Sequence, residues 1–239
     1  MSIGGHLNLK VIGWIVAFAV AIVGSALAWV YFAGGSGEPS TELTTPTIVS
    51  APSTEAVGTV KTFVIDSAQS VASFEIDEVL RGSPNQVLGQ TNQVAGQVQV
   101  DLADLSSTQF SQIVVNARTF RTGSDQRDRA IRGPIILNSA SDEFEFIILD
   151  IDSATGLGGS AEPGDMLSFS IAGNLTIKGV TNEVVFDVEV TLSDESTVEG
   201  SVTTTVLRSD FDIGIPSVPG VAEVTDEVVL SLRFVAVAG

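Results

Sequence analysis

The sequence of 239 residues has no cysteine and only one histidine, His6. Without cysteine the chain forms no disulfide, has no thiol nucleophile and offers no thiolate to a metal ion. Because His6 lies ahead of a long apolar stretch, the rest of the chain lacks the imidazole that Ser–His–Asp and Cys–His catalysis and the usual zinc sites require. We therefore expect a protein that is not an enzyme and that holds no metal or other cofactor.

Basic residues are also few. The chain has 11 lysine and arginine residues against 29 aspartate and glutamate residues, which gives a formal net charge of −18. Lys10 is the only lysine or arginine ahead of Lys61, and every acidic residue follows it, so the acidic excess lies in the C-terminal part. Such a charge repels nucleic acid at long range, and we expect no nucleic-acid partner.

Charged residues are absent from 11–33, an apolar stretch of 23 residues with tryptophan near both ends. A helix of this length spans a bilayer, and aromatic residues suit its two interfaces. With Lys10 before it and Glu38 after it, the positive-inside rule places residues 1–10 in the cytoplasm and the rest outside. The pattern predicts a single-pass membrane protein with an extracytoplasmic domain. The alternative is a signal peptide cleaved after Ala28, at the end of an A-x-A pattern, which releases a secreted protein.

Large apolar residues are scarce in 34–58, which is rich in Gly, Ser, Thr and Pro. A segment of this composition does not fold alone. As a flexible spacer it would span about 27 Å on average. We expect it to let a domain formed by 59–239 stand clear of the membrane surface.

From residue 59 onward apolar and polar residues alternate. Phe74 and Ile76, for example, alternate with Ser73, Glu75 and Asp77. This period predicts strands with one dry and one wet face. Eight or so antiparallel strands of this kind close into a barrel or pack as a sandwich, so the pattern predicts an all-β domain.

Two short segments interrupt the alternation. Lys178-Gly179 divides two apolar runs as a tight hairpin turn would. Residues 124–133, SDQRDRAIRG, are the best candidate for a short helical turn.

Four segments, taken in order, are similar to the YceI-like family. The most specific is Gly173–Thr181, GNLTIKGVT, which is close to the family's G-x-L-T-I-K-G-V-T signature. The others are the opening strand, the T-G-x-x-x-R-D segment and the late R-S-D-F stretch, found here at Phe63–Phe74, Thr122–Asp128 and Arg208–Phe211. The resemblance covers the chain from about Thr59 to its C-terminus.

This resemblance implies an eight-stranded antiparallel, lipocalin-like β-barrel. For some members of the family it also implies a long apolar tunnel that holds an isoprenoid chain. Two departures concern the ligand more than the fold. The family's histidine before Ser70 is Gln69 here, and the usual D-F-F-D stretch is replaced by Ile135–Asn138.

The inward apolar residues are the main candidates for ligand contact. Aromatic residues make up only 6% of the chain, and small branched side chains leave room inside a barrel that large rings would fill. The alternative is an ordinary packed core. The candidate ligand-binding residues are Phe74, Ile76, Val98, Val100, Ile113, Val115, Phe144, Phe146, Phe169, Ile171, Phe186 and Val188.

Arg127 is the polar candidate. It belongs to a cluster of five arginines between positions 118 and 132 of an otherwise acidic domain. Guanidinium groups here could grip a phosphate or quinone headgroup at the barrel mouth. The alternative is structural, with Arg127 or Arg129 paired to Asp125 or Asp128.

Together these features predict an extracytoplasmic, membrane-tethered binding protein that holds an isoprenoid or other lipid-like ligand inside its barrel. The alternative is an envelope interaction domain with a filled core and no ligand.

Overall fold

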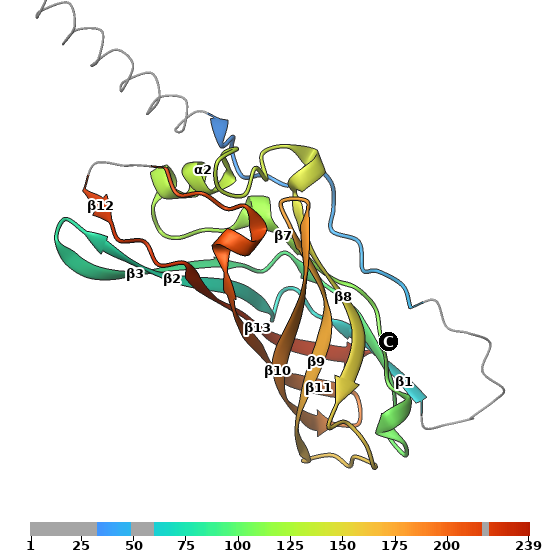
Figure 1. Cartoon of the computed structure of the whole chain (residues 1–239). Coiled ribbons are helices and arrows are strands. Elements are labelled where there is room, and N and C mark those ends of the chain that lie inside the picture. The colour runs from blue at the N-terminus through green and yellow to red at the C-terminus, as the bar shows by residue number, and fades with distance from the viewer. Residues whose placement is uncertain (1–32, 49–59, 217–219) are drawn as a thin grey trace, which may run out of the picture.

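The computed structural model describes residues 33–48, 60–216 and 220–239. A single antiparallel sheet of 13 strands curls into a half-barrel, and all of its short helical segments except one near residue 105 gather at one end of it (Figure 1). None of the described helices is long and apolar enough to cross a membrane. The predicted membrane segment 11–33 lies outside the described residues except for Ala33.

The elements follow the chain closely. The strands are β1 (Val60–Ile65), β2 (Val71–Leu80), β3 (Ser83–Thr91), β4 (Val94–Ala95), β5 (Gln97–Asp101), β6 (Gln109–Phe110), β7 (Ile113–Asn116), β8 (Phe146–Thr155), β9 (Met166–Ile177), β10 (Val180–Asp194), β11 (Thr197–Leu207), β12 (Val221–Ala222) and β13 (Glu227–Ala238). The helical segments that pack on them are the α-helix α2 (Asp125–Arg132) and the 3₁₀ turns η1 (Leu105–Ser107), η2 (Ala117–Thr119), η3 (Asp142–Phe144) and η4 (Arg208–Phe211).

Strand β13 is the centre of the sheet. It pairs with β11 along its whole length, while its other edge pairs first with β2 and then, towards its C-terminus, with β1. Beyond β1 the sheet continues through β5, and on the other side it runs from β11 through β10, β9 and β8 to β7. The predicted antiparallel β fold is confirmed. The number of strand segments exceeds the expected eight partly because β4, β6 and β12 are only two residues long.

Two-residue turns set the register of the long hairpins. Lys178 and Gly179 both have positive φ, 53° and 79°, and join Ile177 to its partner Val180. This geometry matches the right-handed twist of the strands, as in a type I′ turn, and it confirms the hairpin expected there. Arg81 and Gly82 (φ 53° and 84°) make a similar turn between β2 and β3.

The predicted helical turn is α2. Ser124 caps its start by accepting a hydrogen bond from the backbone N–H of Arg127, and Asp125 and Asp128 lie in the first turn. Arg129 and Arg132 lie in the last turn, so the charges at both ends complement the helix dipole. The sequence therefore specifies this helix locally, and Ile131 buries its apolar face in the core.

Candidate functional site

A cavity of about 480 Å³ lies between the inner face of the sheet and the helical end of the domain. Its walls come from β2, β3 and β13, from α2, and from the segment after β11. The volume lies within the roughly 300–1,000 Å³ usual for ligand sites. Most of its lining is apolar: Phe74, Ile76, Leu80, Val87, Phe120, Ala130, Ile131, Ile136, Leu137, Ile147, Ile177, Val206, Phe211, Ile213, Ile215, Pro216, Val221, Val224, Val228 and Leu230.

Two aromatic rings meet at the wall of this larger cavity. Phe74 and Phe120 form an edge-to-face pair with ring centroids 5.2 Å apart and an interplanar angle of 72°. Gly89 is the cross-strand partner of Phe74, and a Cβ built on it would lie 2.1 Å from the Phe74 ring. The absence of a side chain at Gly89 therefore lets the ring lie across β3.

Four charged side chains also line the larger cavity, namely Glu78, Arg81, Arg127 and Arg208. Arg127 donates from Nη2 to Oε1 of Glu78 at 3.4 Å, and Glu78 is 8% exposed. Arg208 donates to two backbone carbonyl oxygens, those of Thr225 and Ile213. The lining thus carries three cations and one carboxylate, whereas the whole chain is strongly acidic.

A second cavity of about 130 Å³ lies at the other end of the half-barrel. Strands β5, β9, β10, β11 and β13 contribute to it, and its lining is almost wholly apolar. Leu105 of η1 and Ala161 contribute to its lining. The backbone N–H of Ala161 donates to the carbonyl oxygen of Leu102, which fixes this wall against β5.

The two cavities share no lining residue. Leu149, Leu175 and Phe186 line neither, and all three are at least 94% buried in the main core cluster. Leu149 and Leu175 are cross-strand partners on β8 and β9. On β8 and β9, Ile147 and Ile177 lie towards the larger cavity from Leu149 and Leu175 and line it. Ile151 and Ile171 lie in the opposite direction along the strands and line the smaller cavity. We call Leu149, Leu175 and Phe186 the dividing layer.

The predicted ligand-contact residues divide between these places. Those that line the larger cavity are Phe74, Ile76 and Arg127. Those that line the smaller cavity are Val98, Val100, Ile113, Phe169, Ile171 and Val188. Phe186 belongs to the dividing layer, and Val115 packs against the same core cluster without lining either cavity.

Phe144 and Phe146 line neither cavity. The inward residues of β8 are Ile147, Leu149 and Ile151, one position away from the predicted phase. Phe144 belongs to η3, and its ring lies 3.0 Å from the place where a Cβ of Gly179 would be. The phase was wrong because residues 144–149, FEFIIL, are nearly all apolar, so alternation does not distinguish their two faces.

The pairing of Arg127 also differs from expectation. Its partner is Glu78, 49 positions away, and Asp128 instead accepts hydrogen bonds from the backbone and hydroxyl of Thr122. Arg127 therefore links α2 to β2.

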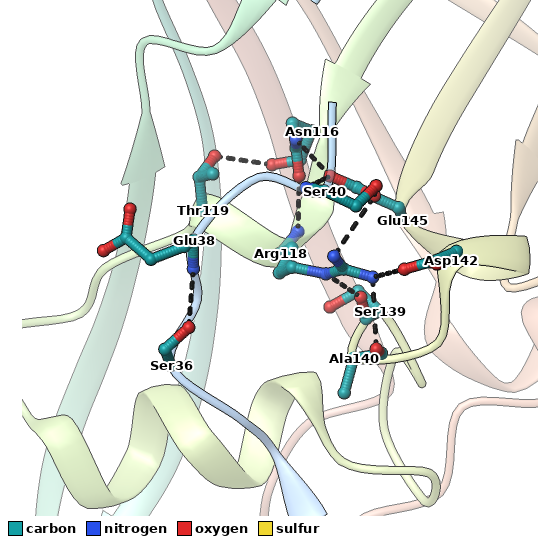
Figure 2. A network of polar contacts seen from close by, with 10 residues as sticks. All are labelled: Ser36, Glu38, Ser40, Asn116, Arg118, Thr119, Ser139, Ala140, Asp142 and Glu145. Atoms are coloured by element: carbon teal, nitrogen blue, oxygen red, sulfur yellow. Dashed lines mark hydrogen bonds and ion pairs between the residues drawn. The ribbon is translucent and has the colours of Figure 1, made fainter. Parts of the chain in front are cut away.

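Arg118 belongs to a buried network centred on Glu145 (Figure 2). The Glu145 side chain is fully buried, with Arg118 Nη1 3.3 Å from Oε2 and Asn116 Nδ2 donating to Oε1 at 2.8 Å. Arg118 also donates to the backbone carbonyls of Ser139 and Ala140 and pairs with Asp142. The network braces the loops at the helical end. Composition gave no signal of it, except that Glu145 is a charge within an apolar run.

Ser40 completes this network from the N-terminal side. Its backbone N–H donates to Glu145 Oε1 at 2.9 Å, and its hydroxyl donates to Oε2. Burial raises the pKa of Glu145, but the hydrogen bonds from Ser40 and Asn116 and the Arg118 charge together bring it below its usual value. The ionised carboxylate is therefore the form that holds the segment.

A second attachment lies six residues earlier. Arg132 donates from Nε to the carbonyl oxygen of Gly34 at 2.7 Å and from Nη2 to that of Gly35 at 3.1 Å. A Cβ on Gly34 would lie 1.8 Å from the carbonyl oxygen of Arg129, so the backbones are in close contact. Residues 34–40, predicted as part of a flexible spacer, are thus bound to the domain. We call them the N-terminal strap.

Comparisons with known proteins agree with this architecture. The YceI-like domain family matches residues 63–236. A UPF0312 protein of Staphylococcus aureus (strain bovine RF122) is 27% identical over 157 residues, which are 63% of this chain and 81% of that protein.

Two solved structures share the fold. BcnA of Burkholderia cenocepacia aligns with a TM-score of 0.56 and 20% identity, over 72% of this chain and 98% of that one. A polyisoprenoid binding domain from Saccharophagus degradans, implicated in plant cell wall breakdown, aligns with a TM-score of 0.56 and 10% identity, over 75% and 99%. The match of the family over residues 63–236 shows that this chain belongs to the YceI-like domain family.

Proposed function

We propose that this protein binds an apolar, lipid-like molecule, of which an isoprenoid chain is the leading example, in the larger cavity. The observation that carries the proposal is the apolar space of about 480 Å³ itself. The fold shared with a polyisoprenoid binding domain supports it. Binding, rather than catalysis, is the role that suits the family and an interior so largely apolar.

The driving force is the removal of ligand surface from water. Burial contributes roughly 25 cal/mol per Å² of apolar area, or about 0.8 kcal/mol per methylene group. A chain that lies along Phe74, Phe120 and Leu230 gains this energy without a specific polar partner. The apolar wall thus selects the chain of the ligand by its shape and length.

Mass spectrometry of bound lipid tests this proposal. The full chain is purified in a non-ionic detergent and extracted with organic solvent, next to two variants on β13. Val228 lines the larger cavity, and Val228→Trp fills it, whereas the adjacent Val229 is 36% exposed and Val229→Trp lies on the outer face. We expect a co-purifying lipid with the wild type and Val229→Trp, and loss of it with Val228→Trp. Equal lipid content in all three, with folding verified by circular dichroism, contradicts the proposal.

The alternative role is an interaction domain of the cell envelope with a filled core and no ligand. A cavity of about 480 Å³ is the observation against it. If no lipid is recovered from any of the three proteins while surface cross-linking captures a reproducible partner, this alternative replaces the binding role.

We also propose that residues 11–33 tether the domain to the membrane, with the domain outside the cytoplasm. The proposal rests on the uncharged apolar stretch and on Lys10 before it. Protease added to intact spheroplasts should remove the domain, while a tag on residues 1–10 stays protected. The intact mass of the recovered protein separates a retained anchor from cleavage after Ala28, which would shorten the chain and release it.

A further inference from the structure

The charges around the larger cavity have the opposite sign to the rest of the protein. The chain carries a net charge of −18, yet the charged residues that line this cavity are three arginines and one glutamate. A cavity that took only a neutral chain would have no need of excess cations beside its apolar wall. This local reversal of charge indicates that the ligand carries a negatively charged group in addition to its apolar chain.

The arginines gather near the end of β2. Arg127 is bonded to Glu78 of this strand, and Arg81 follows it in the β2–β3 turn. Arg208 donates to the carbonyl oxygen of Thr225, whose own backbone N–H donates to the carbonyl oxygen of Asp77. All three cations therefore lie at one part of the cavity wall.

The single carboxylate in the lining does not balance them. Glu78 Oε1 already accepts hydrogen bonds from Arg127 and from Asn85 Nδ2, the latter at 2.9 Å. Arg208 is held by neutral carbonyl oxygens, with Asp226 3.8 Å away. Arg81 is exposed, and among residues 33–48, 60–216 and 220–239 nothing accepts a hydrogen bond from its side chain. The lining therefore retains positive charge, with Arg81 available to a ligand.

The surrounding acidic surface does not cancel this effect. Charges beyond about 8–10 Å are largely screened at physiological salt, whereas a contact beside an apolar wall is screened much less. Guanidinium groups form short, charge-assisted hydrogen bonds with carboxylate and phosphate oxygens. An anion at the rim is thus favoured locally even though the protein repels anions at a distance.

We infer that the ligand is an amphiphile whose anionic headgroup, a carboxylate or a phosphate, lies between Arg81 and Arg127 while its chain extends towards Phe74 and Phe120. This inference rests on the proposed lipid-binding function and specifies its ligand class. Arg81 supplies a guanidinium that donates to no residue the structure describes, and Arg127 shares its own between Glu78 and the headgroup.

Ligands with the same chain and different headgroups test the inference. Hexadecanoate, hexadecyl phosphate and hexadecanol are titrated against the full chain in a non-ionic detergent, with displacement of the apolar fluorophore N-phenyl-1-naphthylamine as the signal. The signal of the Val228→Trp variant is subtracted as background. We expect at least one of the two anions to displace the probe at about tenfold lower concentration than the alcohol, the change expected of one charge-assisted hydrogen bond. Which anion is preferred distinguishes a carboxylate ligand from a phosphate ligand.

Arginine variants assign the effect to the site. Arg81→Gln should reduce the anion preference severalfold and leave hexadecanol binding unchanged, and Arg81→Gln with Arg127→Gln should abolish the preference. Arg233→Gln is the matched control, because Arg233 is exposed on β13 and lines neither cavity. The Arg81→Gln variant, in an exposed turn, keeps the test valid if loss of Arg127 impairs folding.

The outcomes separate the two proposals. Equal binding of the acid, the phosphate and the alcohol overturns the headgroup inference and leaves the lipid-binding function standing. Anion preference that survives both arginine substitutions also overturns it. Failure of all three to displace the probe overturns the proposed function itself.

Discussion

Glu145 shows how one buried charge fastens distant parts of the chain. Ser40 reaches it from the N-terminal side, Asn116 and Arg118 reach it from the end of β7 and the turn that follows, and together they satisfy its two oxygen atoms. Because the pKa of Glu145 is lowered on folding, its ionised form stabilises the fold above the pKa of the unfolded chain. That contribution is lost as the pH falls through the lower pKa of the folded state.

Glu145→Gln should therefore destabilise the protein by about 2 kcal/mol at pH 7, because Arg118 loses its buried anion. The difference between wild type and variant should shrink at acidic pH, where the wild-type carboxylate is protonated. Urea unfolding of the full chain at both pH values measures it. Asp142→Asn is the control, since Asp142 is 81% exposed and its loss should cost under about 1 kcal/mol. A penalty that does not vary with pH would rule out this role for the charge.

Gly89 is a second residue whose importance comes from a neighbour. Gly89→Val would place atoms on the Phe74 ring, which must then leave its position beside Phe120. We expect a loss of about 1–3 kcal/mol in stability from overpacking, and weaker binding of the apolar fluorophore. Gly158→Ala is the control because no atom lies within 4 Å of its Cβ position. Unchanged probe binding in a folded Gly89→Val protein would show that the Phe74 ring does not shape the site.

At the scale of elements, sequence patterns predicted the structures that depend on residues close together in the sequence. The hairpin at Lys178-Gly179 and the capped helix α2 follow from turn and capping residues and agree with the structure. The phase of β8 was missed because its first residues are apolar on both faces. The pairing of Arg127 with Glu78 was missed because it joins residues far apart in the sequence.

The N-terminal strap was missed for a related reason. Its glycines and serines have no pattern that separates a flexible spacer from a segment bound to a complementary surface. The binding partners, Arg132 and Glu145, come from α2 and from the residue before β8. Composition describes a segment in isolation, whereas contacts with Arg132 and Glu145 determine whether this segment is bound to the domain.

The strap and the larger cavity contact different sides of α2. Gln126, Arg127, Ala130 and Ile131 line the cavity, whereas Arg132 and the backbone of Arg129 contact the strap. The strap therefore supports a helix that forms part of the cavity wall.

Gly34→Val should detach the strap, because a side chain at this position overlaps the carbonyl oxygen of Arg129. We expect amide hydrogen exchange in α2 to rise about tenfold or more, as one charge-assisted hydrogen bond is lost. Exchange in β9 and β10 should stay unchanged. Thr41→Val, at an exposed position just beyond the strap, is the control. If α2 exchanges equally in both variants and the wild type, the strap does not support the helix.

At the scale of the whole molecule, we expect the dividing layer to limit the length of a chain that binds in the larger cavity. Its members come from the neighbouring strands β8, β9 and β10, and Leu149 and Leu175 are direct cross-strand partners. The sequence predicted apolar inward faces and the family, but the separation into two cavities depends on which side chains stack at one level of the interior. That level is a property of register and curvature, not of any single strand.

Leu149→Ala should open the dividing layer and connect the two cavities. Wild-type affinity for a series of primary alcohols should rise with chain length and then level off, since an added methylene contributes about 0.8 kcal/mol only while it is buried. In the variant the rise should continue to longer chains, at a cost of about 2–5 kcal/mol in stability. Leu207→Ala, on an exposed residue, is the control. Identical length profiles for all three proteins would show that the layer is no barrier.

Helix α2 has eight residues, with the larger cavity on one side and the N-terminal strap on the other. A ligand in the larger cavity and the N-terminal strap would both stabilise this short helix, so their binding is coupled. If a bound ligand stabilises α2, it must raise the affinity of the domain for residues 34–40 by the same factor by which the bound strap raises the affinity for the ligand. A force that pulls the N-terminal strap away from the domain would then lower the affinity for the ligand. The amount of lipid bound to the protein would respond to mechanical tension.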